Sequence, residues 1–214
     1  MHTFTRAIQT VTQKAWLQFK FITSLNKLSR DGSKDYQKYL SSQVHKTITK
    51  IDKDPGFRYK RLIKELLKVC AGTKIEVLCV GCRNHYELDA FERAGFEKVV
   101  GIDLVSVDSR ITVMDMHDMK FADNSFDVIY SADSLEHAFD IERVAREFCR
   151  VVRNNGYLVI QMPTNIPQVN EIDRWDIRDL NNLSKLFRGD VKSISIEWSR
   201  VESKSLSVIF SVKK

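Results

Sequence analysis

The chain has 214 residues, a length that suits one domain of ordinary size with an additional terminal segment. Hydrophobic residues make up 43% and charged residues 29%, and the eight glycines and three prolines exclude a collagen-like or low-complexity chain. The apolar runs are far shorter than the roughly 20 residues of a membrane span. The four cysteines are too sparse for a disulfide scaffold, and we see no secretory leader pattern. We therefore expect a folded, cytoplasmic protein.

The positive charge is concentrated at the front of the chain. The first 74 residues hold 16 Lys and Arg against 5 Asp and Glu, whereas the other 140 residues hold 18 against 23. Residues 1–30 contain no acid, and their apolar side chains recur every three to four positions, which predicts a basic amphipathic helix. Such a helix can dock on the domain, contact an anionic membrane peripherally, bind nucleic acid or target an organelle. All four interpretations stay open.

Two breaks follow this helix, at Asp31-Gly32-Ser33 and at Asp54-Pro55-Gly56. Further helices are expected over residues 34–51 and 57–71.

From Glu76 onward, apolar strands alternate with helical patterns, which predicts parallel strands joined by crossover helices. The expected strands are Glu76 to Gly81, Lys98 to Leu104, Ile111 to Met116, Phe126 to Ser131 and Tyr157 to Met162. The expected helices are Glu87 to Ala94, Ile141 to Val152 and Ile177 to Phe187. Two closing runs, Ser193 to Arg200 and Ser205 to Val212, suggest an antiparallel edge hairpin. The predicted fold class is α/β, with a doubly wound, Rossmann-like, mostly parallel seven-stranded sheet, this hairpin and an N-terminal helical extension.

In such a sheet, a ligand binds outside the carboxyl ends of the strands, where the strand order reverses. The first strand-to-helix turn lies within residues 77–84, and its Gly81 allows the backbone to approach a ligand. Asp103 ends the second strand about 20 residues later, where an acid can bind both hydroxyls of a ribose. These features predict a nucleoside site but do not separate a methyl donor from a dinucleotide.

The segment from Asp115 to Ser131 distinguishes a methyl-donor site from a dinucleotide site. It contains an acid, an aromatic residue and an Asp-Asn-Ser-Phe-Asp turn, and Ser134-Leu135-Glu136-His137 and Asn154-Asn155-Gly156 follow it. Over roughly residues 75–163, the sequence resembles the class I S-adenosylmethionine-dependent methyltransferases, especially the family often called methyltransferase type 11. The resemblance implies S-adenosyl-L-methionine as methyl donor and S-adenosyl-L-homocysteine as product.

The resemblance also implies a role for each matching residue. Asp103 would bind the ribose, Asp115 the adenine amino group, and Met116 the adenine ring. Gly81 would pass close to the methionine portion. The donor-binding candidates are Val80, Gly81, Cys82, Arg83, Asn84, Glu87, Asp103, Leu104, Asp115, Met116, Ser131 and Ala132. In domain terms, residues 57–214 would form the methyltransferase domain and residues 1–56 a basic helical extension or lid.

The first turn departs from the family's pattern, which has an acid on the first strand and up to three glycines. Cys79 takes the place of the acid, and Arg83 and His85 stand where later glycines often occur. Either Glu87 or Asn84 supplies the missing polar contact in an active enzyme, or the site binds weakly and catalyses nothing. We favour the first alternative because both site aspartates remain.

Methyl transfer makes small catalytic demands, because the sulfonium donor is already activated and the enzyme mainly aligns the reactants. His137, which follows the fourth strand, is the first candidate for a general base, and Glu136 is a weaker one. His137 fits equally well as a packing or capping residue, and Trp175 either stacks on a substrate or fills the core. Cys79 and Cys82 form a Cys-x-x-Cys with no second pair, so we expect no metal site.

The expected function is methyl transfer to an oxygen, nitrogen or carbon of a small or modest-sized acceptor. The alternative is an RNA-associated methyltransferase, or a catalytically degenerate S-adenosylmethionine-binding protein, whose basic residues 1–74 bind nucleic acid. A dinucleotide-dependent dehydrogenase fits less well, because the chain lacks a Gly-x-Gly-x-x-Gly motif.

Overall fold

The computed structural model describes residues 15–16, 19–26, 28, 32–55, 58–164, 175, 180–187, 189–198 and 204–214. The basic helix predicted over residues 1–30 lies largely outside these ranges, and residues 19–26 within it are helical. Among the described residues, no helix is both long enough and apolar enough to cross a bilayer.

The core of the molecule is a seven-stranded sheet in the order β3-β2-β1-β4-β5-β7-β6. Its strands are β1 (Glu76–Val80), β2 (Lys98–Asp103), β3 (Ile111–Val113), β4 (Phe126–Ala132), β5 (Val152–Thr164), β6 (Gly189–Trp198) and β7 (Lys204–Val212). Strands β1 to β5 pair in parallel, whereas β7 runs antiparallel to both β5 and β6. The order reverses between β1 and β4. The predicted fold class, including the edge hairpin, is confirmed.

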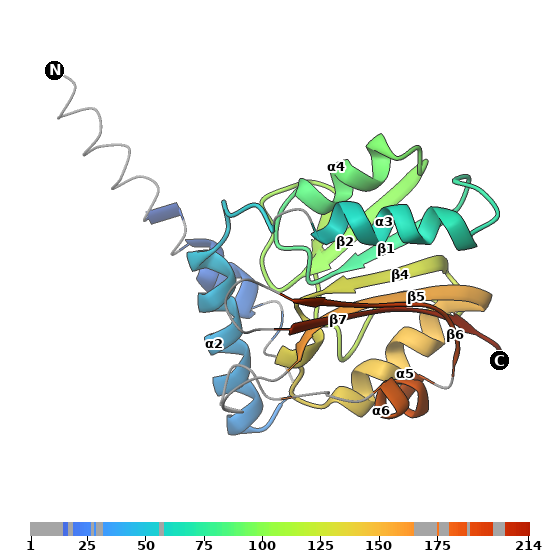
Figure 1. Cartoon of the computed structure of the whole chain (residues 1–214). Coiled ribbons are helices and arrows are strands. Elements are labelled where there is room, and N and C mark those ends of the chain that lie inside the picture. The colour runs from blue at the N-terminus through green and yellow to red at the C-terminus, as the bar shows by residue number, and fades with distance from the viewer. Residues whose placement is uncertain are drawn as a thin grey trace, which may run out of the picture.

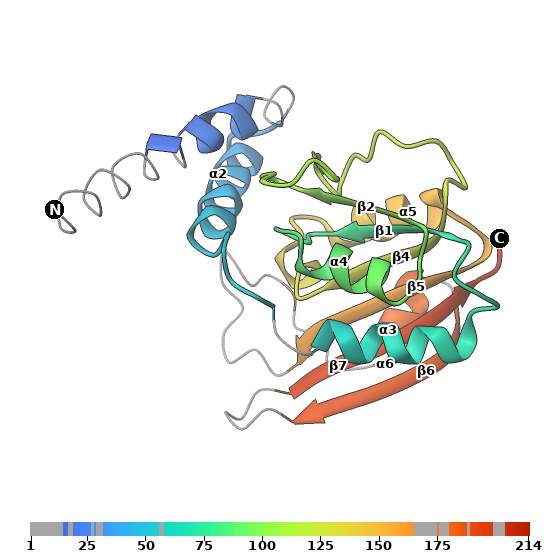
Figure 2. The same cartoon turned by 90° about the horizontal axis from the view of Figure 1, so that it is seen from above.

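Helices cover both faces of the sheet. The helices of the described residues that have defined bounds are α2 (Lys34–Thr49), α3 (Arg58–Val69), α4 (Tyr86–Arg93), α5 (Ile141–Val151) and α6 (Leu180–Phe187), with a short 3-10 helix η1 (Leu135–His137) after β4. Of these, α3 to α6 cover the faces. Figure 1 shows α3 and α4 on one face of the sheet and α5 and α6 on the other. Helix α2 lies across the end toward which the parallel strands run, as Figure 2 shows from above.

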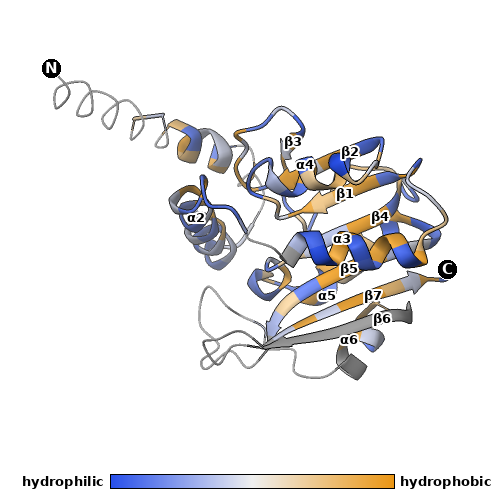
Figure 3. Ribbon diagram, turned by 45° about the horizontal axis from the view of Figure 1, so that its top comes forward, coloured by the Kyte–Doolittle hydropathy of each residue, from blue (hydrophilic) through white to orange (hydrophobic). Residues whose placement is uncertain are grey.

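The sequence of α5 explains how these layers form. Asp140 caps the helix by accepting a hydrogen bond from the backbone N–H of Arg143 at 2.9 Å. Ile141, Val144 and Phe148 follow at spacings of three and four residues, so they share one face and are buried against the sheet. Figure 3 shows the result, with apolar strands enclosed between helices whose outer faces are polar.

Predicted boundaries of three strands were wrong. Strand β6 begins at Gly189 rather than at Ser193. Strand β3 ends at Val113 rather than at residue 116, because the chain then turns, with the N–H of Asp118 donating to the carbonyl of Asp115 at 3.1 Å. Strand β5 begins at residue 152 and includes the Asn-Asn-Gly segment expected ahead of it, where its pairing with β4 shifts register. Gly156 is required there, since a Cβ would lie 2.7 Å from the carbonyl oxygen of Asp127.

Candidate active site

A cavity of about 500 Å³ lies at the carboxyl ends of β1, β2 and β4, and we call it the strand-end cavity. This volume is typical of a site for a small molecule. Tyr39, Gln43 and Lys46 of α2 contribute to its wall. All the predicted donor-binding residues line it except Ser131, and both predicted catalytic residues line it as well.

Asp103 lies at the centre of this arrangement, at the end of β2. Its Oδ2 accepts the backbone N–H of Arg83 at 2.9 Å, and its Oδ1 accepts that of Leu104 at 2.6 Å and that of Val105 at 3.4 Å. Burial raises the pKa of this carboxyl, while the three N–H groups act in the opposite direction. The side chain is therefore fixed by backbone donors from the turns after β1 and β2.

Gly81 in the first turn is required by its surroundings. Its φ is +75°, and a Cβ would lie 2.5 Å from the Cβ of Ser134. The Ser134 hydroxyl lies 2.6 Å from that of Ser131 and donates to the carbonyl of Val80 at 3.2 Å. Ser131 is thus behind the cavity wall, in a contact that ties β4 to the first turn.

Two polar residues of the first turn, Arg83 and Asn84, bind the segment between α2 and α3. A guanidinium nitrogen of Arg83 donates to the carbonyl of Lys50 at 3.2 Å. The side-chain amide of Asn84 donates to the carbonyls of Ile51 at 2.7 Å and Lys53 at 3.0 Å. These residues therefore hold the N-terminal helices against the strand-end cavity.

Glu87 is a buried acid whose charge acts on Cys79, the residue that replaces the acid of the first strand. It lines the strand-end cavity, is 4% exposed, and accepts a hydrogen bond from the hydroxyl of Tyr130 at 3.2 Å. Burial raises its pKa to about 8, so the carboxyl carries a proton at neutral pH. Cys79 is fully buried and its pKa is raised by burial, so its thiol offers no anion. Because both amide hydrogens of Asn84 are engaged, Glu87 is the better candidate of the two.

Asp115 forms a second acidic wall of the cavity. Its Oδ1 accepts the backbone N–H of His117 at 2.9 Å and lies 2.6 Å from the Nδ1 of that ring, while its Oδ2 accepts the hydroxyl of Tyr36 on α2. The Nε2 of His117 accepts the N–H of Phe139 at 3.0 Å, which places the ring proton on Nδ1, toward Asp115. Burial acts to raise the pKa of Asp115, but the bonds from His117 and Tyr36 outweigh it and the pKa is lowered.

The two predicted base candidates lie side by side after β4. His137 Nε2 is 2.9 Å from the ammonium of Lys46 on α2, and 3.6 Å from Oε1 of Glu136. Burial raises the pKa of Glu136 to about 7. The Lys46 ammonium occupies the lone pair of Nε2, so Glu136 is the group better placed to accept a proton.

Two other sequence features are structural. Trp175 donates from its ring N–H to the carbonyl of Ala138 at 2.7 Å and packs against the core. Cys79 and Cys82 are free, buried thiols, and within the described ranges no group of three or more His, Cys, Asp or Glu could hold a metal ion.

Sequence reasoning missed Tyr36, Lys46 and Gln161 as parts of the site. Neither α2 residue lies in a recognisable motif, and the expectation of a lid was the only signal that residues from this segment would line the cavity. Gln161 was not recognised because it lies within the otherwise apolar run from Leu158 to Met162.

The sheet order, the reversed edge strand and the strand-end cavity define a Rossmann-like α/β protein with the class I methyltransferase architecture. Residues 78–160, from β1 into β5, match the family model described as a methyltransferase domain. This segment is therefore similar to a methyltransferase domain, and the chain has the fold of the class I S-adenosylmethionine-dependent methyltransferases. No curated protein sequence matches the chain.

Solved structures share this fold at low sequence identity. The 1,6-didemethyltoxoflavin-N1-methyltransferase of Burkholderia thailandensis, with bound 1,6-didemethyltoxoflavin and S-adenosylhomocysteine, has a TM-score of 0.69 and 14% identity over 86% of this chain and 92% of that chain. The PH0226 protein of Pyrococcus horikoshii OT3 has a TM-score of 0.59 and 18% identity over 85% of this chain and 100% of that chain. The (4+2)-cyclase SpnF has a TM-score of 0.60 and 15% identity over 72% of this chain and 81% of that chain. Since one is a methyltransferase and another a cyclase, the activity has to be argued from the site.

Proposed function

We propose that the strand-end cavity binds S-adenosylmethionine and that the chain transfers its methyl group to a small or modest-sized acceptor. The observation that carries this proposal is the carboxylate of Asp103 at the cavity wall. The backbone N–H groups of Arg83, Leu104 and Val105 occupy three of the about four acceptor sites of this carboxylate, which leaves one site on Oδ2 for a ribose hydroxyl. Because backbone groups already fix the carboxylate, binding requires little reorganisation.

Asp115 and Met116 would hold the adenine. Three donor groups already bond to the Asp115 carboxylate, and a carboxylate has about four acceptor sites, so one remains for an adenine amino group. Gly81 and Glu87 lie at the first turn, where the methionine portion would bind. An ammonium beside Glu87 would favour ionisation of this carboxyl and so replace the acid absent from β1.

The donor supplies a methyl group already activated by its sulfonium. The remaining tasks of the chain are to hold the acceptor in line and to take up a proton. Glu136 and His137 lie at the same cavity for that second task.

Calorimetric titration with S-adenosylmethionine and S-adenosylhomocysteine tests the proposal. Asp103→Ala removes a hydrogen bond to a charged group, worth about 1.5–3 kcal/mol, so we expect the affinity to fall by at least about tenfold. Asp123→Ala is the matched control, because Asp123 is 68% exposed and is not among the residues lining the cavity. No binding of either ligand at millimolar concentration refutes the proposal. Unchanged affinity in the Asp103 variant would place the ribose elsewhere.

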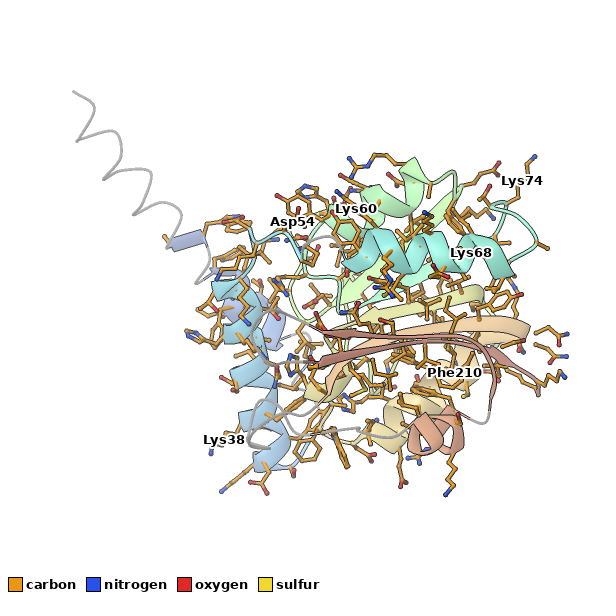
Figure 4. All side chains as sticks on the ribbon, in the orientation of Figure 1. Lys38, Asp54, Lys60, Lys68, Lys74 and Phe210 are labelled. Atoms are coloured by element: carbon orange, nitrogen blue, oxygen red, sulfur yellow. The ribbon has the colours of Figure 1, made fainter. Side chains whose placement is uncertain are left out.

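A second candidate is association with RNA. Lys60, Lys68 and Lys74, on α3 and the turn after it, are exposed, and Figure 4 shows them along one side of the molecule, whereas Lys38 on α2 lies at the other end. Lys68 already pairs with Glu65 at 2.7 Å. Phosphate contacts release counterions, so RNA affinity should fall linearly with the logarithm of salt concentration. Affinity that is absent or independent of salt rejects this candidate.

A further inference from the structure

Two buried oxygens in the wall of the strand-end cavity accept no hydrogen bond from the described residues. They are Oε2 of Glu136 and Oε1 of Gln161, in side chains of residues that are only 2% and 1% exposed. A buried acceptor without a donor is costly, and native proteins rarely leave one unexplained. Two such acceptors at one cavity indicate a ligand that brings the donors.

The orientation of Gln161 is set by its neighbour Asp133. The side-chain Nε2 of Gln161 donates to Oδ1 of Asp133 at 3.3 Å, and its backbone carbonyl accepts the N–H of Asp133 at 3.0 Å. Rotating the amide by half a turn would place its oxygen against a carboxylate, so Oε1 remains the free acceptor. Asp133 has φ of +50°, an uncommon conformation for a residue other than glycine, which is typical of functional sites.

Glu136 is also held in place. Its backbone carbonyl accepts the N–H of Trp175 at 3.2 Å, and its Oε1 lies 3.6 Å from the His137 ring. We call Asp133, Glu136 and Gln161 the acid–amide cluster, and all three line the cavity.

The chemistry of the acid–amide cluster selects among acceptors. It presents carboxyl and amide oxygens, so it disfavours a carboxylate or phosphate. A hydroxyl donates one hydrogen bond, which is too few for two unsatisfied oxygens. A primary or secondary amine donates two or three when protonated, and its positive charge complements the acids.

We propose that the acid–amide cluster binds the acceptor substrate through a primary or secondary amine, which makes the chain an N-methyltransferase. This inference rests on the proposed donor site, and it names the acceptor class for that site.

The reaction then balances through Glu136. The protonated amine gives one proton to the Glu136 carboxylate, which leaves a lone pair on nitrogen. A nitrogen–carbon bond forms to the methyl group while the carbon–sulfur bond breaks, and its electron pair stays on sulfur. The products are S-adenosylhomocysteine, a methylated ammonium and a protonated Glu136. Burial raises the pKa of Glu136 to about 7; the charge of Asp133 acts in the same direction, and His137 and Lys46 act against it. The Glu136 carboxyl can therefore hold this proton near neutral pH.

Matched ligands test the acceptor class on the protein saturated with S-adenosylhomocysteine. The probes are benzylamine, benzyl alcohol and benzoate, with butylamine, butanol and butyrate as an aliphatic set, and binding is followed by ligand-observed NMR. We expect each amine to bind at least about tenfold more tightly than its alcohol, since a charged hydrogen bond is worth a factor of this order. Equal or tighter binding of the alcohols or carboxylates overturns the inference, as does the absence of amine binding at 10 mM.

Variants locate the amine. Glu136→Gln and Gln161→Met should each remove most of the amine preference while leaving the affinity for S-adenosylhomocysteine within about twofold. Glu142→Gln is the control, because Glu142 is 77% exposed on α5 and should change neither. If both cluster variants weaken S-adenosylhomocysteine tenfold instead, the cluster holds the amino group of the donor and the inference is wrong. If the wild-type chain does not bind S-adenosylhomocysteine, the proposed function itself fails, which is a separate outcome.

Discussion

Replacing Glu87 by glutamine tests whether a protonated carboxyl is buried beside the first turn. Burial raises the pKa of Glu87 from its ordinary 4.5 to about 8. The folded chain therefore binds one proton more than the unfolded chain between these pH values. Under that condition, the free energy of unfolding falls as pH rises from about 4.5 to about 8. Glutamine has the shape of the protonated acid and cannot ionise, so Glu87→Gln should lack this loss.

The expected magnitude follows from the two pKa values. One pKa unit corresponds to about 1.36 kcal/mol, and integration between pH 5 and pH 8 gives a loss of about 3.5 kcal/mol in the wild-type chain from this group. In the folded chain Glu87 is 4% exposed, and the Tyr130 hydroxyl is its hydrogen-bond partner.

Urea unfolding of both proteins at pH 5, 6, 7 and 8 measures the difference directly, because all other groups titrate alike in the two chains. The variant should gain about 3.5 kcal/mol relative to wild type across this range. Glu142→Gln, at an exposed position on α5, serves as the control and should follow the wild type. Parallel pH curves for wild type and Glu87→Gln would refute a raised pKa at this position.

Three further predictions concern stability. Gly81→Ala should destabilise the fold by at least about 1 kcal/mol, because it combines a positive φ with a close contact to Ser134, and adding Ser134→Gly should recover part of the loss in thermal melting. Asn84→Ala leaves two carbonyls between α2 and α3 without their donor and should cost about 1–3 kcal/mol in urea unfolding; a cost below 0.5 kcal/mol would contradict the contact. Arg150→Ala breaks hydrogen bonds to two carbonyls of the loop after β3 and should lower the melting temperature by about 4–8 °C. Arg146 is 67% exposed one turn earlier, so Arg146→Ala should leave the melting temperature unchanged. Equal melting temperatures of the two variants would contradict a stabilising role for the Arg150 bonds.

The sequence predicted the sheet well because its strands have a simple physical cause. Apolar runs bounded by turns and helices specify parallel strands buried on both faces, and the parallel strands bring their carboxyl ends to one edge. Asp103 and Asp115 end or follow such strands, so their places at the cavity followed from their positions in the chain.

Contacts between distant segments were beyond that reasoning. Lys46 meets His137 across 91 positions, and Tyr36 meets Asp115 across 79. No local periodicity encodes such pairs, because both depend on how α2 lies over the finished sheet. The irregular start of β5 was missed for a related reason, since Gly156 looks like an ordinary turn glycine until the carbonyl of the neighbouring strand is in place.

The hydrogen bonds from Arg83 and Asn84 to residues 50–53 have an evolutionary consequence. In this chain the turn after β1 is hydrogen-bonded to one particular segment, residues 50–53. A chimera that exchanged α2 for the N-terminal helices of another protein of this fold would leave the donors of this turn without their carbonyls. Conversely, replacing both Arg83 and Asn84 by glycine would remove the hydrogen bonds to the segment that follows α2. The two segments can therefore be expected to change together during divergence, so that the loop and its covering helix are inherited as one unit.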